Sequence, residues 1–493
     1  MSSRVWLMVS LLTACSRPNE RTAEPARSVA VSRDASADAP PADALPAATP
    51  EAADVLPGPA ERPATVPPAL RRSLTLDGAN GVEIVALGFA PDLALYAAGS
   101  FSQGLAVGKT KLPSATPRDP RQQVFLARIR PDGTLDWLIR LGRKDPASVE
   151  GLAVAPDGSA VVIGNFVAGD DTMFEGPTNV DSFLIAVGPD GKVRWQQLIE
   201  GGTQGGHTGM ITGVTIGGDG AVTVCGMYAG PTRFAPGHEV TSVAGPYVPS
   251  TDAFVARYAA TGTFDWVRTG GGTEDDRAEV VTTLPGGDVV VAGQLGRDAQ
   301  FGTRALPGPG ESQIANPSRA FVAAYTPTGA LRWATQYGQL DEERPQAIVP
   351  RTDGSVVVAG VESELTGPRN AFGFVVHLDR TGAQRGSHAI RGAATFMTGM
   401  PAVSVRLEAG ALVFERHEPG ASHPVATVKL PRTPAILPTA LARGSDGRVA
   451  LGVQTGAPTE TPIGNRTTRV SFEHVDAVVS IAPALDQLVI AAH

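Results

Sequence analysis

Cysteine is nearly absent from this chain: its 493 residues include two, Cys15 and Cys225. Two cysteines cannot supply the disulfide framework of a small secreted domain. Cys225 lies inside the apolar run 223–227, where a buried and inert thiol is far commoner than a nucleophile. The sequence therefore excludes a disulfide scaffold and gives little reason to expect cysteine chemistry.

Basic and aromatic residues are also scarce. The formal net charge of −8 argues against a nucleic-acid ligand and against a polybasic membrane-binding face. Only 5% of residues are aromatic, and tryptophan recurs at one repeat position, which indicates packing and not a ligand cage. After the N-terminal segment, no apolar run reaches the ~18 residues that a membrane-spanning helix needs.

Motifs of catalysis and metal binding are missing as well. The eight histidines show no HExxH-like spacing and no pairing with a nearby cysteine. There is no Gly-x-Ser-x-Gly nucleophile elbow and no calcium loop of the EF-hand type. Glycine-rich runs such as 270–272 have no helix after them, so they indicate turns and not phosphate cradles. The alternative of an active site assembled from residues of separate loops stays open.

What the chain does contain is a repeat, clearest in the stretch Asp252–Leu295. Apolar runs at 254–258, 264–267, 280–284 and 289–292 are separated by turn residues. Each run has about five residues rich in Val, Phe and Trp, which predicts four antiparallel strands. None approaches the length of a typical helix.

Three anchors recur along the chain. The first is a Gly-containing turn before a tryptophan, the second is a Phe-led apolar run, and the third is an apolar run that ends in glycine. The tryptophans are Trp137, Trp195, Trp266 and Trp333; the phenylalanines are Phe125, Phe183, Phe254, Phe321 and Phe374; the glycines are Gly99, Gly164, Gly226, Gly293, Gly360 and Gly452.

The spacing of these glycines sets the number of units. The intervals are 65, 62, 67, 67 and 92 residues. The last interval can contain one degenerate unit, with Ala411–Glu415 as its strand, so we expect seven units. Tandem four-strand units bury both faces only by stacking, and the closed solution is a β-propeller. An open β-solenoid or two β-sandwiches are the alternatives, although units of this length are too long for solenoid coils.

The fold class predicted is therefore all-β, a single seven-bladed propeller of four-stranded antiparallel blades. Either Leu74–Asp77 or Asp486–Ala491 completes the last blade. The turns between first and second strands and between third and fourth strands are short, and they lie on one face. The other connections are long and irregular, and they form the opposite, long-loop face: 102–123, 167–181, 229–251, 296–319 and 455–474. Binding residues concentrate on such loops.

Polar residues on this face are the candidate binding site at the mouth of the central channel. Glu150, Thr212, Glu279 and Gln346 occupy one repeat position near the start of the innermost strand, and Asp276, Asp341 and Glu343 lie in the preceding loops. One interpretation is that these residues bind a cation or a basic ligand. The commoner situation is that such carboxylates pair with arginines, here Arg277 and Arg344, and only shape the loops. No residue is predicted to be catalytic or to bind a metal.

The N-terminus carries an export signal, with Arg4, the apolar core 5–12 and the sequence Leu12-Thr13-Ala14-Cys15. It resembles the lipobox of bacterial lipoproteins, which implies acylation of Cys15 as the mature N-terminus; an ordinary cleaved signal is the alternative. We expect a signal peptide at 1–14, the acylated cysteine and a disordered Ala/Pro-rich linker at 15–70, and the propeller at 71–493. Ser16 after the cysteine favours the outer membrane by analogy with Gram-negative sorting.

The repeat resembles the seven-bladed β-propeller repeats (SBBP type) of exported bacterial proteins and lipoproteins. The resemblance is carried by DAFVARYAATGTFDWVRTGGGTEDDRAEVV at 252–281 followed by GGDVVVAG, and it covers Val82–Arg391. It implies the propeller fold and no activity.

A weaker similarity, to quinoprotein-like propellers, rests on Gly-x-x-x-Trp at 133–137, 191–195, 262–266 and 329–333. It implies that each tryptophan packs one blade on the next. Some of those proteins are quinone-dependent dehydrogenases, and one is an outer-membrane assembly scaffold. The chain has no adjacent cysteine pair and no Glu/Asn/Asp cluster for a calcium–quinone site, which counts against a redox function.

These patterns together predict a cell-envelope lipoprotein, lipid-anchored in the outer membrane of a Gram-negative bacterium. Its propeller is expected to be monomeric and to bind an envelope protein or glycan through the long-loop face, without a cofactor, although a structural calcium ion is conceivable. A hydrolase or lyase that acts on envelope polymers at the channel mouth is the competing class. A structural surface protein with no discrete ligand is the third.

Overall fold

The computed structural model describes residues 72–78, 82–102, 104–113, 123–142, 147–168, 179–201, 208–243, 250–309, 318–338, 342–363, 371–390, 394–398, 402–408, 411–417, 426–430, 436–443, 449–463 and 467–482. The chain divides into two units, 1–56 and 57–493. All described residues belong to the second unit. The signal peptide, Cys15, the linker, Asp341 and Asp486–Ala491 lie outside the described residues.

The described chain is all-β, and its strands form seven four-stranded antiparallel blades. We number the blades in chain order. Blade 1 contains β2 (Val82–Phe89), β3 (Leu95–Phe101), β6 (Gln123–Ile129) and β7 (Leu135–Leu141); blade 2 contains β8 (Ala147–Val154), β9 (Ala160–Ala168), β10 (Asn179–Val187) and β11 (Val193–Gly201); blade 3 contains β12 (Thr208–Ile216), β13 (Val222–Ala229), β16 (Asp252–Tyr258) and β17 (Phe264–Gly271).

The later blades follow the same order from the innermost to the outermost strand. Blade 4 contains β18 (Arg277–Thr283), β19 (Val289–Leu295), β22 (Arg319–Tyr325) and β23 (Leu331–Tyr337); blade 5 contains β24 (Glu342–Pro350), β25 (Val356–Ser363), β26 (Ala371–Leu378) and β27 (Gln384–Ile390); blade 6 contains β28 (Ala394–Thr398), β29 (Ala402–Glu408), β30 (Ala411–His417) and β31 (Ala426–Leu430); blade 7 contains β32 (Ile436–Arg443), β33 (Val449–Ile463), β34 (Thr467–Ala482) and β1 (Arg72–Gly78).

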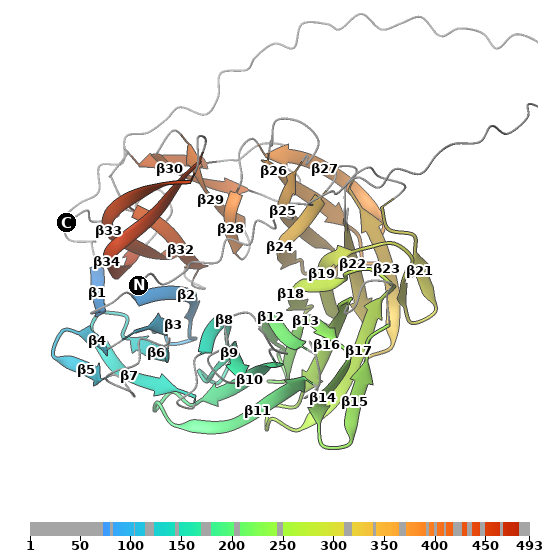
Figure 1. The fold of residues 1–493 in the computed structure, drawn as a ribbon, viewed down its shortest axis with the longest axis horizontal. Coiled ribbons are helices and arrows are strands. Elements are labelled where there is room, and N and C mark those ends of the chain that lie inside the picture. The colour runs from blue at the N-terminus through green and yellow to red at the C-terminus, as the bar shows by residue number, and fades with distance from the viewer. Residues whose placement is uncertain are drawn as a thin grey trace, which may run out of the picture. The chain divides into compact units, whose positions relative to one another are not determined.

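The blades close into a ring around a central opening (Figure 1). The innermost strands contact one another in the order β2, β8, β12, β18, β24, β28 and β32, and β32 contacts β2 again. The predicted seven-bladed propeller is therefore confirmed, and an open solenoid is excluded. The degenerate unit expected around Ala411–Glu415 is blade 6, where β30 is its third strand.

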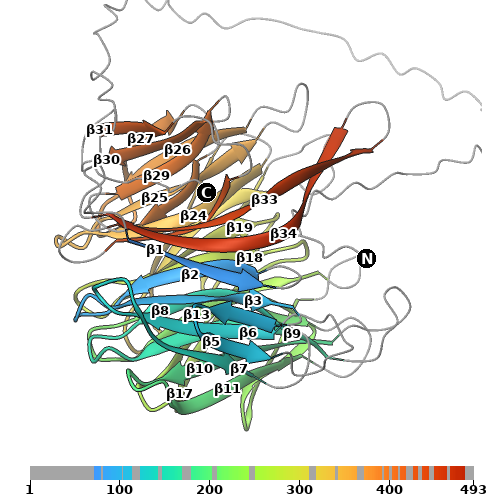
Figure 2. The same cartoon turned by 90° about the vertical axis from the view of Figure 1, so that its left-hand side faces the viewer.

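The ring is closed by the first strand of the described chain. β1 pairs antiparallel with β34, from Arg72 opposite Ile481 to Leu76 opposite Ala477, and so becomes the outermost strand of blade 7. Of the two alternatives left open by the sequence, the N-terminal strand is the one that completes this blade. Because the blade combines both ends of the propeller, opening the ring would break a whole set of strand hydrogen bonds. Figure 2 shows that the β33–β34 hairpin extends beyond the neighbouring strands.

A β-bulge recurs in the innermost strand of every blade. The register shifts at Val85, Glu150, Thr212, Glu279, Gln346, Thr395 and Thr439. The residue that precedes the bulge in blades 1 to 5 is opposite the repeat glycine of the second strand, for example Ala278 opposite Gly293. A Cβ at Gly293 would collide with the carbonyl oxygen of Arg277 and with the ring of Phe321. The repeated Gly and Phe of the sequence are thus two parts of one packing arrangement.

Hydrophobic packing joins neighbouring blades. One core cluster combines Tyr96 and Leu126 of blade 1 with Val162 and Phe183 of blade 2. Equivalent clusters lie between blades 2 and 3, 3 and 4, and 4 and 5. Since each flat blade can bury its faces only against its neighbours, the ring is the unit of stability.

The short turns behave as the sequence predicts. At nine of them a glycine has φ between 77° and 85°, at Gly133, Gly158, Gly191, Gly220, Gly262, Gly287, Gly329, Gly354 and Gly382. Each donates its N–H to the carbonyl three residues earlier, as Gly262 does to Ala259 at 2.8 Å. Residues with a Cβ are strained at this backbone conformation, which explains the recurrent glycine.

The prediction of irregular loops on the opposite face is wrong for three of the five connections. They fold into hairpins: β4 (Gly104–Val107) with β5 (Thr110–Pro113), β14 (Pro231–Ala235) with β15 (His238–Thr241), and β20 (Ala299–Phe301) with β21 (Arg304–Leu306). β4, β14 and β20 pair with the last two residues of β1, β11 and β17 respectively. We call these the rim hairpins. These connections form hairpins because an outermost strand exposes unpaired backbone groups, with which a nearby segment can form hydrogen bonds.

Candidate functional site

The four residues predicted at the channel mouth occupy the bulge position of blades 2 to 5. Glu150, Thr212, Glu279 and Gln346 are each the extra residue of their bulge. The equivalent residues in the remaining blades, which sequence reasoning missed, are Val85, Thr395 and Thr439. Val85 could have been found by counting back from Gly99, whereas Thr439 lies one residue out of this count from Gly452 and blade 6 has no repeat glycine from which to count.

Glu279 is held by two arginines. Its carboxylate lies 2.9 Å from Nε of Arg277 in its own strand and 3.1 Å from Nε of Arg344 in blade 5, and its side chain is 9% exposed. Thr212 makes a second contact between blades, because its hydroxyl donates to the carbonyl of Ala278 in blade 4 at 2.7 Å. Both side chains therefore connect neighbouring blades.

Glu150 differs from Glu279 because it has no arginine partner among the described residues. Its Oε1 accepts a 2.9 Å hydrogen bond from the hydroxyl of Ser148. Surrounding protein raises the pKa of Glu150, and the charge of Glu279 adds to this effect. Glu150 and Glu279 lie at the bulges of the innermost strands of blades 2 and 4.

Glu83 of blade 1 joins this acidic group, although sequence reasoning did not select it. Burial raises the pKa of Glu83, and the charge of Glu150 raises it further. Gln346 is exposed. In the part of the chain that the structure describes, no group of three His, Cys, Asp or Glu side chains is arranged to hold a metal ion.

Asp276 and Glu343 are carboxylates inside the protein. Asp276 lies in a loop as predicted, whereas Glu343 belongs to β24, because the strand begins one residue earlier and pairs Glu343 with Glu362. Asp276 is 0% exposed and accepts hydrogen bonds from the backbone N–H groups of Gly272 at 2.8 Å and Gly296 at 2.9 Å. Burial raises the pKa of Asp276 to about 8. Glu343 is 1% exposed and lies 3.1 Å from Nη1 of Arg319. Neither side chain reaches the solvent at the channel mouth.

The four repeat tryptophans contact the turn of the next blade. Each indole N–H donates to a carbonyl in the turn between the third and fourth strands of the following blade: Trp137 to Pro189, Trp195 to Ala260 and Trp266 to Pro327 at 2.9 Å, and Trp333 to Arg380 at 3.0 Å. A Cβ on the turn glycine would strike the indole ring, at Gly191, Gly262, Gly329 and Gly382 in turn. The glycine therefore allows the ring to lie flat against the turn backbone.

Cys225 is fully buried in β13. Its sulfur lies 3.7 Å from the Thr212 hydroxyl, and burial raises the pKa of the thiol to about 12. At neutral pH the reactive thiolate is scarce, so the geometry provides no activated nucleophile.

Comparison with known proteins identifies no family. No protein-family model matches the sequence, and no curated protein matches it either. The resemblance to the SBBP-type repeat therefore stays a prediction beyond the propeller fold itself. Within the described ranges, no helix is long and apolar enough to cross a membrane.

Solved structures similar to the chain include several β-propellers. BamB from Moraxella catarrhalis is 12% identical, with 81% of this chain and 99% of that chain covered and a TM-score of 0.36. The polysaccharide lyase Uly1 is 10% identical, with coverage of 84% and 98% and a TM-score of 0.45. The β-propeller domain of the Trilobed protease from Pyrococcus furiosus is 7% identical, with coverage of 80% and 93% and a TM-score of 0.42. At such low identity these similarities carry no information on activity.

Proposed function

We propose that this chain is a lipoprotein of the bacterial cell envelope, anchored through Cys15 to the outer membrane, whose propeller binds an envelope protein or glycan through the long-loop face. The observation that carries this proposal is the position of the rim hairpins. All three belong to connections between second and third strands, and all three pair with the long-loop end of an outermost strand. The blades are regular, so what this chain adds to the scaffold is concentrated on one side of it.

The polar residues at the channel mouth support a binding scaffold more than an enzyme. Glu279 is paired with two arginines, and Thr212 is bonded to the next blade. General acid or base catalysis needs a group that is free to exchange a proton with the substrate. Glu150 and Gln346 are the exposed residues among the four predicted at the channel mouth.

Site-specific photo-cross-linking of the full-length chain in native membranes tests the binding face. A photoreactive residue replaces exposed Lys111, Glu239 or Arg304 on the rim hairpins, and exposed Lys192, Thr261 or Thr352 in the opposite turns serve as matched controls. We expect the hairpin positions to cross-link a discrete partner and the turn positions to give none. Equal cross-linking from both faces, or no product from any position, would contradict the proposal.

The lipid anchor is tested separately. Cys15→Ser should abolish metabolic labelling with palmitate and release the chain from the membrane fraction, because several acyl chains contribute about 0.8 kcal/mol per buried methylene to membrane binding. Cys225→Ser is the matched control, since this thiol is buried in the propeller. Membrane retention of the Cys15→Ser variant would overturn the anchor.

A further inference from the structure

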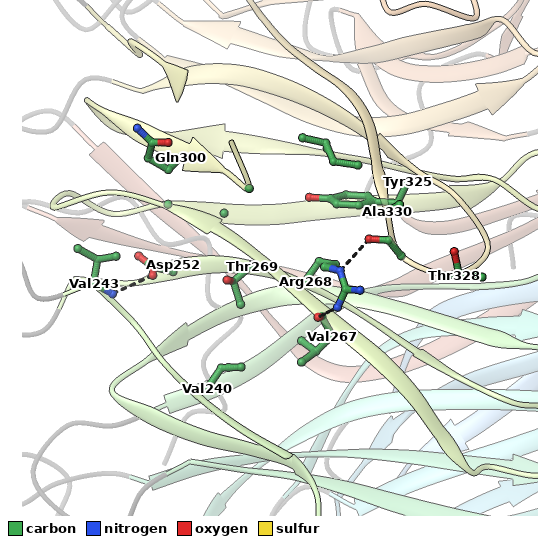
Figure 3. Close-up of a pocket in the computed structure, with 15 residues that line it drawn as sticks. Val240, Val243, Asp252, Val267, Arg268, Thr269, Gln300, Tyr325, Thr328 and Ala330 are labelled. Atoms are coloured by element: carbon green, nitrogen blue, oxygen red, sulfur yellow. Dashed lines mark hydrogen bonds between the residues drawn. The ribbon is translucent and has the colours of Figure 1, made fainter. Parts of the chain in front are cut away.

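A groove on the rim of blade 3 is the feature that the candidate site does not include. It has a volume of about 560 Å³ and follows the outermost strand β17. Val240 and Val243 line it on the side of the β14–β15 hairpin, and Gln300 of β20 and Leu331 of blade 4 line it on the other side. Figure 3 shows these two walls, with Asp252 and Arg268 between them.

The outer edge of β17 is only partly covered. β20 pairs with it at Gly270 and Gly271 alone. The chain then turns away at Gly302, whose φ of 58° is left-handed, and it returns as β21. Residues 264–269 of β17 pair inward with β16, and no described strand pairs with their outer edge. An edge of this kind can accept an additional extended strand.

Two charged side chains give the groove its polarity. Asp252 is 3% exposed; its Oδ2 accepts the N–H of Val243 at 2.9 Å, and its Oδ1 has no hydrogen-bond partner among the described residues. Arg268 donates to the carbonyls of Gly329 and Val267, both at 2.7 Å, and no carboxylate partner is found for it in the described ranges. A buried carboxylate without a cation, such as Asp252, is incompletely compensated. Arg268 is exposed, so its guanidinium is solvated and offers a positive charge at the surface of the groove.

One exposed side chain of the groove is apolar. Val243 is 47% exposed, and it is one of two large hydrophobic side chains that are exposed in the described part of the chain. Arg268, Gln300 and Thr328 are exposed polar residues of the lining. The uncovered backbone edge of β17 favours an extended peptide over a glycan, because a glycan has no series of N–H and C=O groups that could pair with a strand.

We propose that the groove binds an extended peptide segment that pairs with the outer edge of β17 at residues 264–269, with a basic side chain directed at Asp252 and an acidic one at Arg268. Asp252 lies against Gly271, where β20 already pairs with β17, so the peptide ends opposite Thr269 and its basic side chain extends past the paired segment to reach Asp252. The inference rests on the proposed binding function and narrows the partner to a protein.

Blade 2 provides a matched control edge. β11 is capped by the β14–β15 hairpin in the same way that β17 is capped by β20, at its last two residues. Gln197 of β11 occupies the position of Arg268 and donates to the carbonyl of Gly262 at 2.9 Å. Arg268→Gln therefore removes the charge and keeps a side chain that makes this bond in the neighbouring blade.

The test uses the full-length protein and a fluorescein-labelled ten-residue peptide of alternating Val and Thr, with one Lys and one Glu. Fluorescence anisotropy measures its affinity, and we expect Asp252→Asn and Arg268→Gln each to weaken binding roughly tenfold, as expected for loss of a charge-assisted hydrogen bond. Glu200→Gln, a charge removal at the control edge, should leave the affinity unchanged. N-methylation of alternate peptide bonds should abolish binding, because strand pairing needs the N–H groups.

Hydrogen exchange provides the second readout. The peptide should protect amides of residues 264–269 and leave those of residues 193–199 unchanged. Absence of binding to the native chain, undiminished binding to the Asp252→Asn and Arg268→Gln variants, or protection at β11 would overturn the inference. If Lys111, Glu239 or Arg304 cross-links a partner while the peptide does not bind the native chain, the groove proposal fails and the proposed function stands. If both signals are absent, the proposed function fails with it.

Discussion

The central channel and the outer rim carry carboxylates in different surroundings. In the channel, Glu279 is compensated by Arg277 and Arg344, and it joins blade 4 to blade 5. On the rim of blade 3, Asp252 and Asp276 are buried with hydrogen-bond donors but without a cationic side chain at bonding distance among the described residues. The repeat places a polar residue at six of the seven bulges, and Thr212 and Glu279 lie close enough to the next blade to pair with it. The rim carboxylates are bonded by neutral donors, so their charges are left for a ligand or for protons.

The largest effect is expected where the inner bulge meets the repeat glycine. Gly293→Ala would place a methyl group against the Arg277 carbonyl and the Phe321 ring, and we expect it to lower the free energy of unfolding by about 3 kcal/mol or more. Gly386→Ala in the outermost strand β27 is the control, because nothing lies within 4 Å of its added methyl group. Urea unfolding measures the free energy of unfolding of both variants. Equal stability of the two variants would refute the expected difference between the inner and the outermost position.

The rim carboxylates should make stability depend on pH. Burial raises the pKa of Asp276 to about 8 and that of Asp252 to about 6, above the ordinary 3.8 of each. The native state thus binds these protons more tightly than the unfolded state. Their stabilising contribution is complete below pH 3.8 and is lost as the pH rises toward 8, with a slope of at most about 1.4 kcal/mol per pH unit for each group.

Asp276→Asn checks this assignment. The variant should be less stable at every pH. The two oxygens of the carboxylate accept hydrogen bonds from two backbone N–H groups, and in the variant an amide nitrogen, which accepts none, would face one of them. Its stability should also vary less between pH 6 and pH 8 than that of the native chain. An unchanged pH slope in chemical denaturation would show that other groups are responsible.

In the channel, Glu279→Gln and Glu150→Gln should lower the free energy of unfolding by different amounts. The first removes the partner of two arginines, and we expect a loss of about 2 kcal/mol. The second replaces a carboxylate whose pKa is already raised by surrounding protein, so its cost should stay within about 0.5 kcal/mol. Thermal unfolding of the two variants at pH 7 makes the comparison, and a greater cost at Glu150 would contradict the pairing argument.

The smallest effect is expected from a single inter-blade hydrogen bond on the rim. Trp266→Phe keeps an aromatic ring against Gly329 and loses the N–H bond to Pro327, which should cost about 1 kcal/mol beyond the change in buried area. Trp333→Phe, which loses the bond to Arg380, provides the replicate in the next blade. If neither variant changes the unfolding midpoint in urea, the indole N–H has no role in joining the blades.

Most of the architecture was predictable from the sequence because it is local and repeated. Three features recur at intervals near 65 residues: a glycine at a turn with positive φ, a tryptophan after it, and a phenylalanine opposite the second strand. Each unit therefore indicates the same geometry. The bulge row could also be located, since Glu150, Thr212, Glu279 and Gln346 keep a constant distance from the following turn. Whether a given member of that row is paired depended on Arg344, which belongs to the next blade.

By itself, the sequence determined the fold class, the number of blades, the side on which the turns are short, and the residues that join one blade to the next. Only the tertiary structure decided that β1 closes the ring, that three connections form rim hairpins, and that Asp252 and Arg268 share a groove along β17. The physical reason is the range of the interactions. Turns and strand periodicity depend on neighbouring residues, whereas closure, edge covering and the compensation of buried charge depend on segments brought together only when the ring is complete.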